Sequence, residues 1–207
     1  MTQPAHTPTD AIHGLSEPND LPTPANGIES QIERLSREIT QNTAQLKELI
    51  RMADTELALP TLNRRSFVRE ASRLCLLARR HKFPLGLIYL NIDHFRRINE
   101  VYGRRGGDAV LEQLAQLLTR LVRNSDLVGR VGADEFCALL SHTSGEAAAG
   151  KGRALVELLR QEPPVYLGHT IETHVTIGTL EVDGRMIDGA MDAAAAEILE
   201  QRQHRLP

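Results

Sequence analysis

The chain has 207 residues, 41% of them hydrophobic, which is enough for one domain of moderate size with its own core plus appendages. A formal net charge of −3 gives no indication of non-specific nucleic-acid binding. No apolar run is long enough to cross a membrane and the amino terminus lacks a basic-then-apolar signal pattern, so we expect a cytoplasmic protein without a membrane span.

The first two segments differ sharply in composition. Residues 1–26 are rich in Pro, Thr and Asp with almost no large apolar side chains, which predicts disorder. Over residues 27–55, apolar residues recur in alternating steps of four and three, with Asn42 as the polar member of the stripe. This heptad pattern predicts a signalling helix that forms a parallel coiled-coil homodimer. The alternative is a helix packed on its own domain. The stripe consists of Ile28, Ile32, Leu35, Ile39, Asn42, Leu46, Leu49 and Ala53.

The remainder alternates between helical and strand patterns. Strands mixed with crossover helices predict an α/β domain with one largely antiparallel sheet. Cys75 and Cys137 have no metal-ligand spacing, so we expect buried free thiols. The expected helices span Ser66–Lys82, Ala109–Leu121, Ala147–Leu159 and Met186–Gln203, and the expected strands lie at Leu85–Leu90, Leu127–Val131, Phe136–Leu140 and within Val165–Val182.

One turn carries adjacent carboxylates. The stretch Arg130-Val-Gly-Ala-Asp-Glu-Phe136 predicts a β-hairpin whose tight turn presents Asp134 and Glu135. Small residues let the backbone approach a ligand closely, and paired acids can hold a hard divalent cation facing phosphate oxygens. An ordinary acidic turn is the alternative, because Gly and Asp are common in hairpins.

Two upstream motifs accompany this hairpin, and they read Leu87-Ile-Tyr-Leu-Asn-Ile-Asp-His-Phe-Arg-Arg-Ile-Asn-Glu-Val-Tyr-Gly103 and Gly106-Gly-Asp-Ala-Val-Leu111. Together the three motifs resemble the GGDEF family, the diguanylate cyclases of bacterial cyclic di-GMP signalling. The resemblance runs from about Glu56 to about Arg205 and implies a ferredoxin-like α/β (α+β) domain over residues 56–207, similar to the palm of nucleotide cyclases and polymerases. In this family two facing domains each hold one GTP and its Mg2+, and each 3′-hydroxyl attacks the other α-phosphorus.

The resemblance assigns expected roles residue by residue. Asp134 and Glu135 would be the catalytic acids, and Asp134, Asn91 and the Ile92 backbone the metal ligands. Asn99 and Asp108 would read the guanine edge. Arg123 and Asp126 match the family's inhibitory R-x-x-D motif, which binds cyclic di-GMP. The other residues expected at the GTP site are Phe95, Arg96, Gly132 and Ala133.

Several positions depart from the family pattern. Asn91 replaces the first metal-binding aspartate and brings no negative charge, so a divalent cation would be held weakly. Ala133 replaces the second hairpin glycine, which costs on the order of 1 kcal/mol if that residue needs a positive φ. At the carboxy end, Leu199 and Gln203 replace a phosphate-binding lysine and arginine, with Arg202 and Arg205 as the nearest cations able to compensate. Arg96 stands for the usual lysine, and Leu59-Pro60-Thr61 replaces the turn at which the upstream helix enters the domain.

These departures favour a GGDEF-domain protein with a degenerate active site. It would bind cyclic di-GMP or GTP with little or no turnover and act through contacts with a signalling protein partner. The first alternative is an active diguanylate cyclase that converts two GTP into cyclic di-GMP and two pyrophosphates. The second is a coiled-coil scaffold that binds no nucleotide.

Overall fold

The computed structural model describes residues 31–43, 45, 59–182 and 186–203. The chain divides into two compact units, Met1–Leu46 and Lys47–Pro207, which we describe separately. In the first unit, residues 31–43 are helical, and the side chains of Ile32, Leu35 and Ile39 are exposed along it. The predicted disorder of residues 1–26 and most of the remaining predicted helix lie outside the described residues. Within the described parts of the chain, no helix combines the length and apolarity that a membrane crossing requires.

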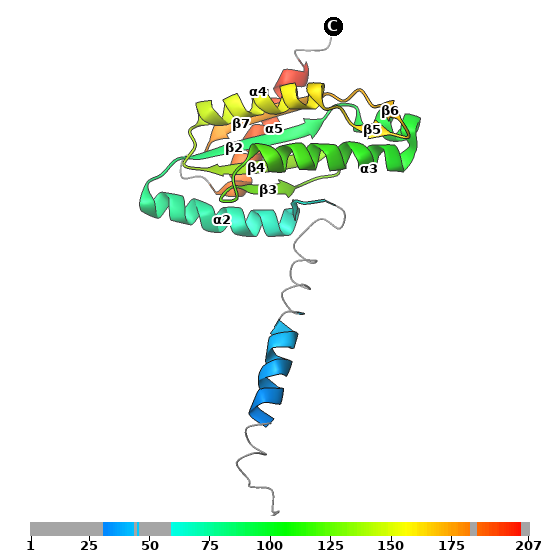
Figure 1. The fold of residues 1–207 in the computed structure, drawn as a ribbon. Coiled ribbons are helices and arrows are strands. Elements are labelled where there is room, and N and C mark those ends of the chain that lie inside the picture. The colour runs from blue at the N-terminus through cyan, green and yellow to red at the C-terminus, as the bar shows by residue number, and fades with distance from the viewer. Residues whose placement is uncertain (1–30, 44, 46–58, 183–185, 204–207) are drawn as a thin grey trace, which may run out of the picture. The chain divides into compact units, whose positions relative to one another are not determined.

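The second unit is built on one five-stranded sheet with the strand order β1-β3-β4-β2-β7 (Figure 1). The short β1 runs parallel to β3, and every other pairing is antiparallel. The predicted α/β class and the largely antiparallel sheet are therefore confirmed. The strands are β1 (Leu62–Asn63), β2 (Leu85–Ile92), β3 (Leu127–Arg130), β4 (Glu135–Ser141) and β7 (Val175–Glu181), and a separate small hairpin contains β5 (Val165–Tyr166) and β6 (His169–Thr170).

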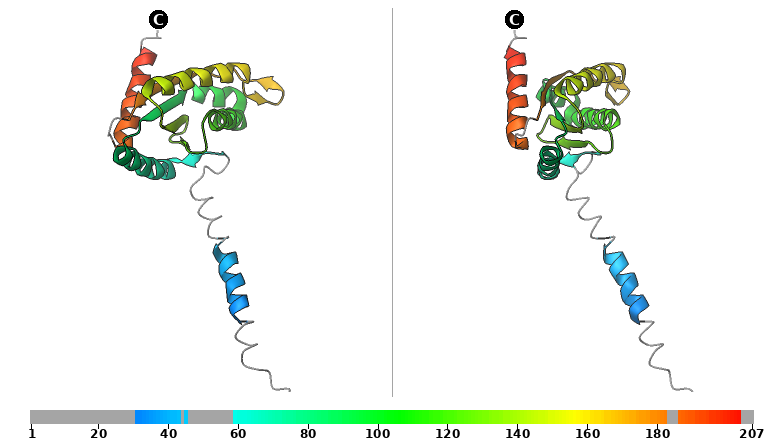
Figure 2. Two further views of the ribbon diagram at one scale, coloured as in Figure 1. Left: turned by 60° about the vertical axis from the view of Figure 1, so that its left-hand side comes forward. Right: turned by 90° about the vertical axis from the view of Figure 1, so that its left-hand side faces the viewer.

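Helices cover both faces of this sheet, which explains why the central strands read as almost continuous apolar runs. The helices are α2 (Arg64–His81), α3 (Phe95–Leu121), α4 (Gly145–Gln161) and α5 (Ile187–Gln203). Figure 2 shows α5, in orange to red, on one side of the sheet and the green α3 and yellow α4 on the other. Alternation along β2 sends Ile88 and Leu90 into the core under α3 and α4, whereas Leu87 and Tyr89 enter the core that α2 and α5 share.

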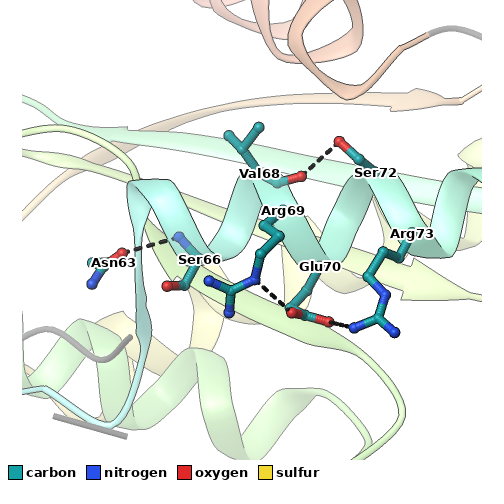
Figure 3. Close-up of polar contacts among 7 residues, drawn as sticks. All are labelled: Asn63, Ser66, Val68, Arg69, Glu70, Ser72 and Arg73. Carbon is teal, nitrogen blue, oxygen red and sulfur yellow. Dashed lines mark hydrogen bonds and ion pairs between the residues drawn. The ribbon is translucent and has the colours of Figure 1, made fainter. Parts of the chain in front are cut away.

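Helix α2 begins two residues earlier than the apolar pattern predicts, because Asn63 caps it. The Asn63 side chain accepts a hydrogen bond from the Ser66 N–H at 3.0 Å, as Figure 3 shows. On the exposed face of the helix, Glu70 lies between Arg69 and Arg73 and pairs with both (Figure 3). The Asn-Arg-Arg sequence at this point therefore starts a helix and also fixes the end of β1.

Helix α3 is interrupted by a bend, which lies earlier in the chain than the glycine pair Gly106 and Gly107. Gly103 has φ 71° and ψ 172° inside an otherwise helical run, so the chain bends there. Gly106 and Gly107 are helical and serve close packing. A Cβ at Gly106 would lie 2.3 Å from the Tyr102 Cβ, and one at Gly107 would lie 2.1 Å from the Asn99 Oδ1. The sequence predicted that this helix begins at Ala109. In the structure its second half begins earlier, because Gly106 and Gly107 are already helical.

Candidate functional site at the carboxyl end of β2

The hairpin turn between β3 and β4 is held by one arginine that the sequence interpretation did not assign a role. Arg130 donates from Nε to the Gly132 carbonyl at 3.2 Å and from Nη2 to the Ala133 carbonyl at 2.7 Å. The turn is closed by the Val131 N–H, which donates to the Glu135 carbonyl at 2.9 Å. The only available signal for this role was the place of Arg130 directly before the turn.

The two small residues of the turn have different requirements. Ala133 is exposed and, within the described chain, is absent from the residues with positive φ, so the conditional cost of replacing glycine does not arise here. Gly132 does need to be small, since a Cβ there would lie 2.1 Å from the Glu135 Oε2. The Glu135 carboxylate thus folds back over Gly132.

Glu135 faces the core that α2 and α5 cover. The hydroxyl of Tyr89 is hydrogen-bonded to the Glu135 carboxylate, and burial followed by this neighbouring charge raises the pKa of Tyr89 well above its usual value. Burial, with a smaller contribution from Glu135, also raises the pKa of the Cys137 thiol. Both cysteines are free thiols, as the sequence predicted, but only Cys137 is buried as expected, whereas Cys75 is half-buried.

The structure brings together the three expected metal ligands. Asn91 is paired with Glu135 on β4 and with Thr176 on β7, and the Ile92 N–H donates to the Asp134 carbonyl at 2.9 Å. Asn91, Ile92 and Asp134 therefore meet at the carboxyl end of β2. Asp134 carries the only formal negative charge among them.

A fourth residue at this end of β2, Asp93, was not singled out by the sequence analysis. The Nη2 atom of Arg202, on α5, lies 2.6 Å from the Asn91 Oδ1 and 2.5 Å from the Asp93 Oδ1. Asp93 also accepts a hydrogen bond from the Thr176 hydroxyl at 2.8 Å. Leu199 and Gln203, at the two positions where the family has cations, are exposed.

Residues expected around the guanine lie along α3. Asn99 is half-buried beside Gly107, and its amide donates to the Phe95 carbonyl at 3.3 Å. Asp108 follows Gly107 and is exposed, so an amide and a carboxylate lie on either side of the Gly103 bend. Phe95 packs against the core.

The Arg96 side chain, by contrast, lies on the exposed surface of α3. It forms an exposed ion pair with Glu100 at 3.0 Å, an arrangement that contributes little stability in water. The Arg96 side chain, which was expected at the GTP site, is thus paired with Glu100 on the surface of α3.

Arg123 and Asp126 lie at the opposite end of β4 from the hairpin acids. Asp126 Oδ2 accepts from the Arg123 N–H at 2.9 Å, and its Oδ1 accepts from the Ser141 N–H at 2.9 Å. Because β4 spans Glu135–Ser141, about 20 Å of strand separates the two places at a rise of about 3.4 Å per residue. The Asp126 carboxylate is held firmly, and Arg123 is exposed beside it.

An open pocket of about 410 Å³ adjoins the hairpin on its α2 side. The Arg64 guanidinium donates to the Val131 carbonyl at 2.9 Å and so fixes one wall of this pocket. Three arginines give the pocket a cationic lining, which suits an anionic ligand. Its lining residues are Asn63, Arg64, Arg65, Arg130, Val131 and Gly132.

The residues at the end of β2 do not fit a resident Mg2+ ion. Magnesium prefers carboxylates combined with substrate phosphates in octahedral geometry. Across the described residues, there is no cluster of three or more His, Cys, Asp and Glu side chains able to hold a metal. In addition, the Asn91 Oδ1 is already bound to a guanidinium.

Comparison with known proteins defines the class. The family profile described as "Diguanylate cyclase, GGDEF domain" matches residues 55–205, so the chain belongs to the GGDEF family. It carries a GGDEF domain of cyclic di-GMP signalling, and the predicted family membership is confirmed.

Individual relatives agree with this assignment. Diguanylate cyclase TpbB of Pseudomonas aeruginosa is 30% identical over 167 residues, which cover 80% of this chain and 38% of that protein. Diguanylate cyclase A of Treponema denticola is 33% identical over 97 residues, covering 47% of this chain and 26% of the relative. The chain thus spans roughly a quarter to two fifths of the length of these curated relatives.

A solved structure shares the fold. The coiled coil and GGDEF domain of DgcB from Caulobacter crescentus, solved in complex with cyclic di-GMP, superposes with a TM-score of 0.79 at 20% identity. The match covers 86% of this chain and 95% of that chain.

Proposed function

We propose that this protein is a GGDEF-domain protein with a degenerate active site, which binds cyclic di-GMP or GTP with little or no turnover and acts through protein contacts. The observation that carries the proposal is the charge at the end of β2. Asn91 brings an amide where a carboxylate would attract a divalent cation, which leaves Asp134 as the only charged member of the expected ligand set. Phosphoryl transfer depends on neutralising charge on the phosphates, and this site supplies little means of doing so.

Cyclic di-GMP binding is proposed for Arg123 and Asp126. The Asp126 carboxylate is fixed by the Arg123 and Ser141 backbone N–H groups, and the Arg123 side chain is exposed next to it. A guanidinium suits this role because it can donate two parallel hydrogen bonds to a phosphate or a guanine edge. Because this place lies at the far end of β4 from Asp134, the missing negative charge at Asn91 does not alter it.

Loss of turnover and retained binding are tested together. Purified protein is incubated with GTP and Mg2+, and the products are separated by chromatography. A parallel calorimetric titration with cyclic di-GMP compares the wild-type protein, Arg123→Ala and a control, Arg160→Ala, which removes an exposed guanidinium paired with Glu157 on α4. We expect no product, binding by the wild-type and control proteins, and at least a tenfold weaker affinity for Arg123→Ala.

An active diguanylate cyclase remains the second candidate, favoured by the intact backbone of the hairpin. Ala133 causes no backbone strain, Arg130 holds the turn, and the Ile92 N–H binds the Asp134 carbonyl. Cyclic di-GMP formed above background and abolished by Asp134→Ala would establish this candidate and overturn the proposal. Neither product nor binding would instead indicate a scaffold, for which the exposed Ile32, Leu35 and Ile39 offer a surface.

A further inference from the structure

The last turns of α5 are bonded to the edge strand β7. The Thr179 N–H donates to the Glu197 Oε2 at 3.1 Å, and the Gln201 Nε2 donates to the Ile177 carbonyl at 3.2 Å. Gln201 also bonds to Glu197 at 3.2 Å, one helical turn away. Polar groups of an edge strand are thereby satisfied by side chains of the same domain. Arg202, the next residue, is consequently held over the ends of β7 and β2.

Arg202 meets a carboxylate that has lost most of its solvent. The Asp93 side chain is 16% exposed and that of Arg202 is 36% exposed. A carboxylate in such surroundings needs a cation or several donors. Here the guanidinium and the Thr176 hydroxyl both bind the same oxygen, Asp93 Oδ1.

The neutral side chain of Asn91 is compatible with the pairing of Arg202 and Asp93. Asn91 Oδ1 accepts a charge-assisted hydrogen bond from Arg202 without adding a second negative charge, so one guanidinium neutralises the single Asp93 carboxylate. A divalent ion placed on the same oxygens would meet a fixed positive charge at short range, and that repulsion opposes binding.

We infer that Arg202 is the protein's own cation at the carboxyl end of β2: it occupies the Asn91 and Asp93 oxygens, excludes divalent metal from them and fixes α5 to the sheet. This inference rests on the proposed loss of turnover and gives it a physical cause. Asn91 and Arg202 then act together, and a side-chain cation takes the place that an external metal ion would have.

The test measures metal binding and stability in the absence of nucleotide. Mn2+ binding is followed by electron paramagnetic resonance, and the melting temperature is recorded with and without Mg2+. The proteins are the wild type, Arg202→Ala, the double variant Asn91→Asp/Arg202→Ala and the control Arg160→Ala. For the wild type and the control we expect no Mn2+ binding at millimolar concentration and no change in melting temperature on adding Mg2+.

The variants should separate the two roles of Arg202. Arg202→Ala should lower the melting temperature by roughly 3–6 °C, because Asp93 loses its cation. The double variant should bind Mn2+ at least ten times more tightly than the wild type and should be stabilised by Mg2+. If Arg202→Ala does not fold, Arg202→Gln replaces it, alone and together with Asn91→Asp, because glutamine removes the charge but keeps an amide donor. Arg202→Lys, which keeps the charge, should still exclude Mn2+.

Stoichiometric Mn2+ binding by the wild type, or a double variant that binds no more tightly, would overturn the inference. An Arg202→Ala protein as stable as the wild type would do the same. These readouts use no nucleotide, so a failure of the proposed function appears separately, as product formation or absent cyclic di-GMP binding.

Discussion

The hydroxyl of Thr61 is buried near the start of the described part of the domain. Thr61 is 2% exposed, and its Oγ1 has no hydrogen-bond partner among the described residues. Burying a hydroxyl without a partner is unfavourable, so Thr61→Val should raise the free energy of unfolding by about 1 kcal/mol. Urea denaturation measures this change.

The control for Thr61 is Thr176→Val. Thr176 is equally buried, but its hydroxyl donates to the Asp93 carboxylate at 2.8 Å. Loss of this bond should lower the unfolding free energy by about 1–2 kcal/mol. If both variants change the free energy of unfolding in the same direction, the prediction that Thr61 lacks a stabilising hydrogen bond is wrong.

Ionisation of Tyr89 should make the stability of the domain depend on pH in the alkaline range. Burial and the Glu135 carboxylate raise the pKa of Tyr89 in the folded state. The folded protein therefore binds this proton more tightly than the unfolded chain, whose tyrosine pKa is about 10. The resulting stabilisation is complete below that pH and is lost as the pH rises above it.

Phenolate absorbance measured alongside circular dichroism tests this response. In the wild type, one tyrosine should ionise only when the protein unfolds, and Tyr89→Phe should remove that step. Tyr102→Phe, which changes an exposed side chain, is the control. Ionisation of Tyr89 while the fold remains intact would contradict the prediction. The thiol of Cys137, whose pKa burial also raises, contributes in the same direction.

At the scale of elements, the packing between the two halves of α3 depends on Gly107, a residue without a side chain. A Cβ at Gly107 would lie 2.1 Å from the Asn99 Oδ1 and 3.2 Å from the Phe95 Cζ. Gly107→Ala should therefore push the two halves of α3 apart and lower the unfolding free energy by about 1–3 kcal/mol. Because Asn99 moves with this contact, GTP binding should weaken as well.

Gly150→Ala on α4 is the matched control. A Cβ there would meet only the Arg153 Nη2, at 3.9 Å, so alanine should raise stability by about 0.5–1 kcal/mol through helix propensity. Thermal unfolding of both variants gives the comparison. Equal effects at the two glycines would show that the contact with Asn99 is unimportant.

The sequence predicts elements well where the signal is local. Periodicity placed the hairpin, the buried strand β2 and the last helix close to their observed bounds, because each pattern lies within one element. Periodicity predicted that the second half of α3 begins at Ala109, later than it does. Glycine in a sequence indicates a helix break, whether it bends the chain, as at Gly103, or allows close packing, as at Gly107. The two-residue strand β1 has no periodicity to detect.

The candidate site was predictable only in part, for a related reason. The family resemblance placed Asn91 and Asp134 in one expected ligand set. In the structure the two lie near each other, because Asn91 pairs with Glu135, the residue after Asp134. The contact of Arg202 with Asn91 and Asp93 joins positions 111 and 109 residues apart. No local spacing encodes such a contact. It results from the packing of α5 on the sheet, which only the fold specifies.

At the scale of the whole molecule, the exposed stripe of the amino-terminal helix predicts a parallel homodimer. Ile32, Leu35 and Ile39 form three successive seam positions, and all are exposed in the single chain. Ile39→Glu would place an unpaired charge in the seam of each chain at about 2 kcal/mol apiece. The dimer should therefore weaken by roughly a thousandfold. Sedimentation equilibrium over a range of concentrations measures this change.

Gln41→Glu provides the control, because it adds the same charge to an exposed position outside the stripe and should leave the dimer intact. Cyclic di-GMP binding serves as the second readout. If Arg123 and Asp126 bind the ligand within one domain, Ile39→Glu should keep the affinity while abolishing association. A wild-type protein that is monomeric at every concentration would refute the coiled-coil dimer. The stripe would then be available either to its own domain or to a different protein, and the scaffold function would gain support.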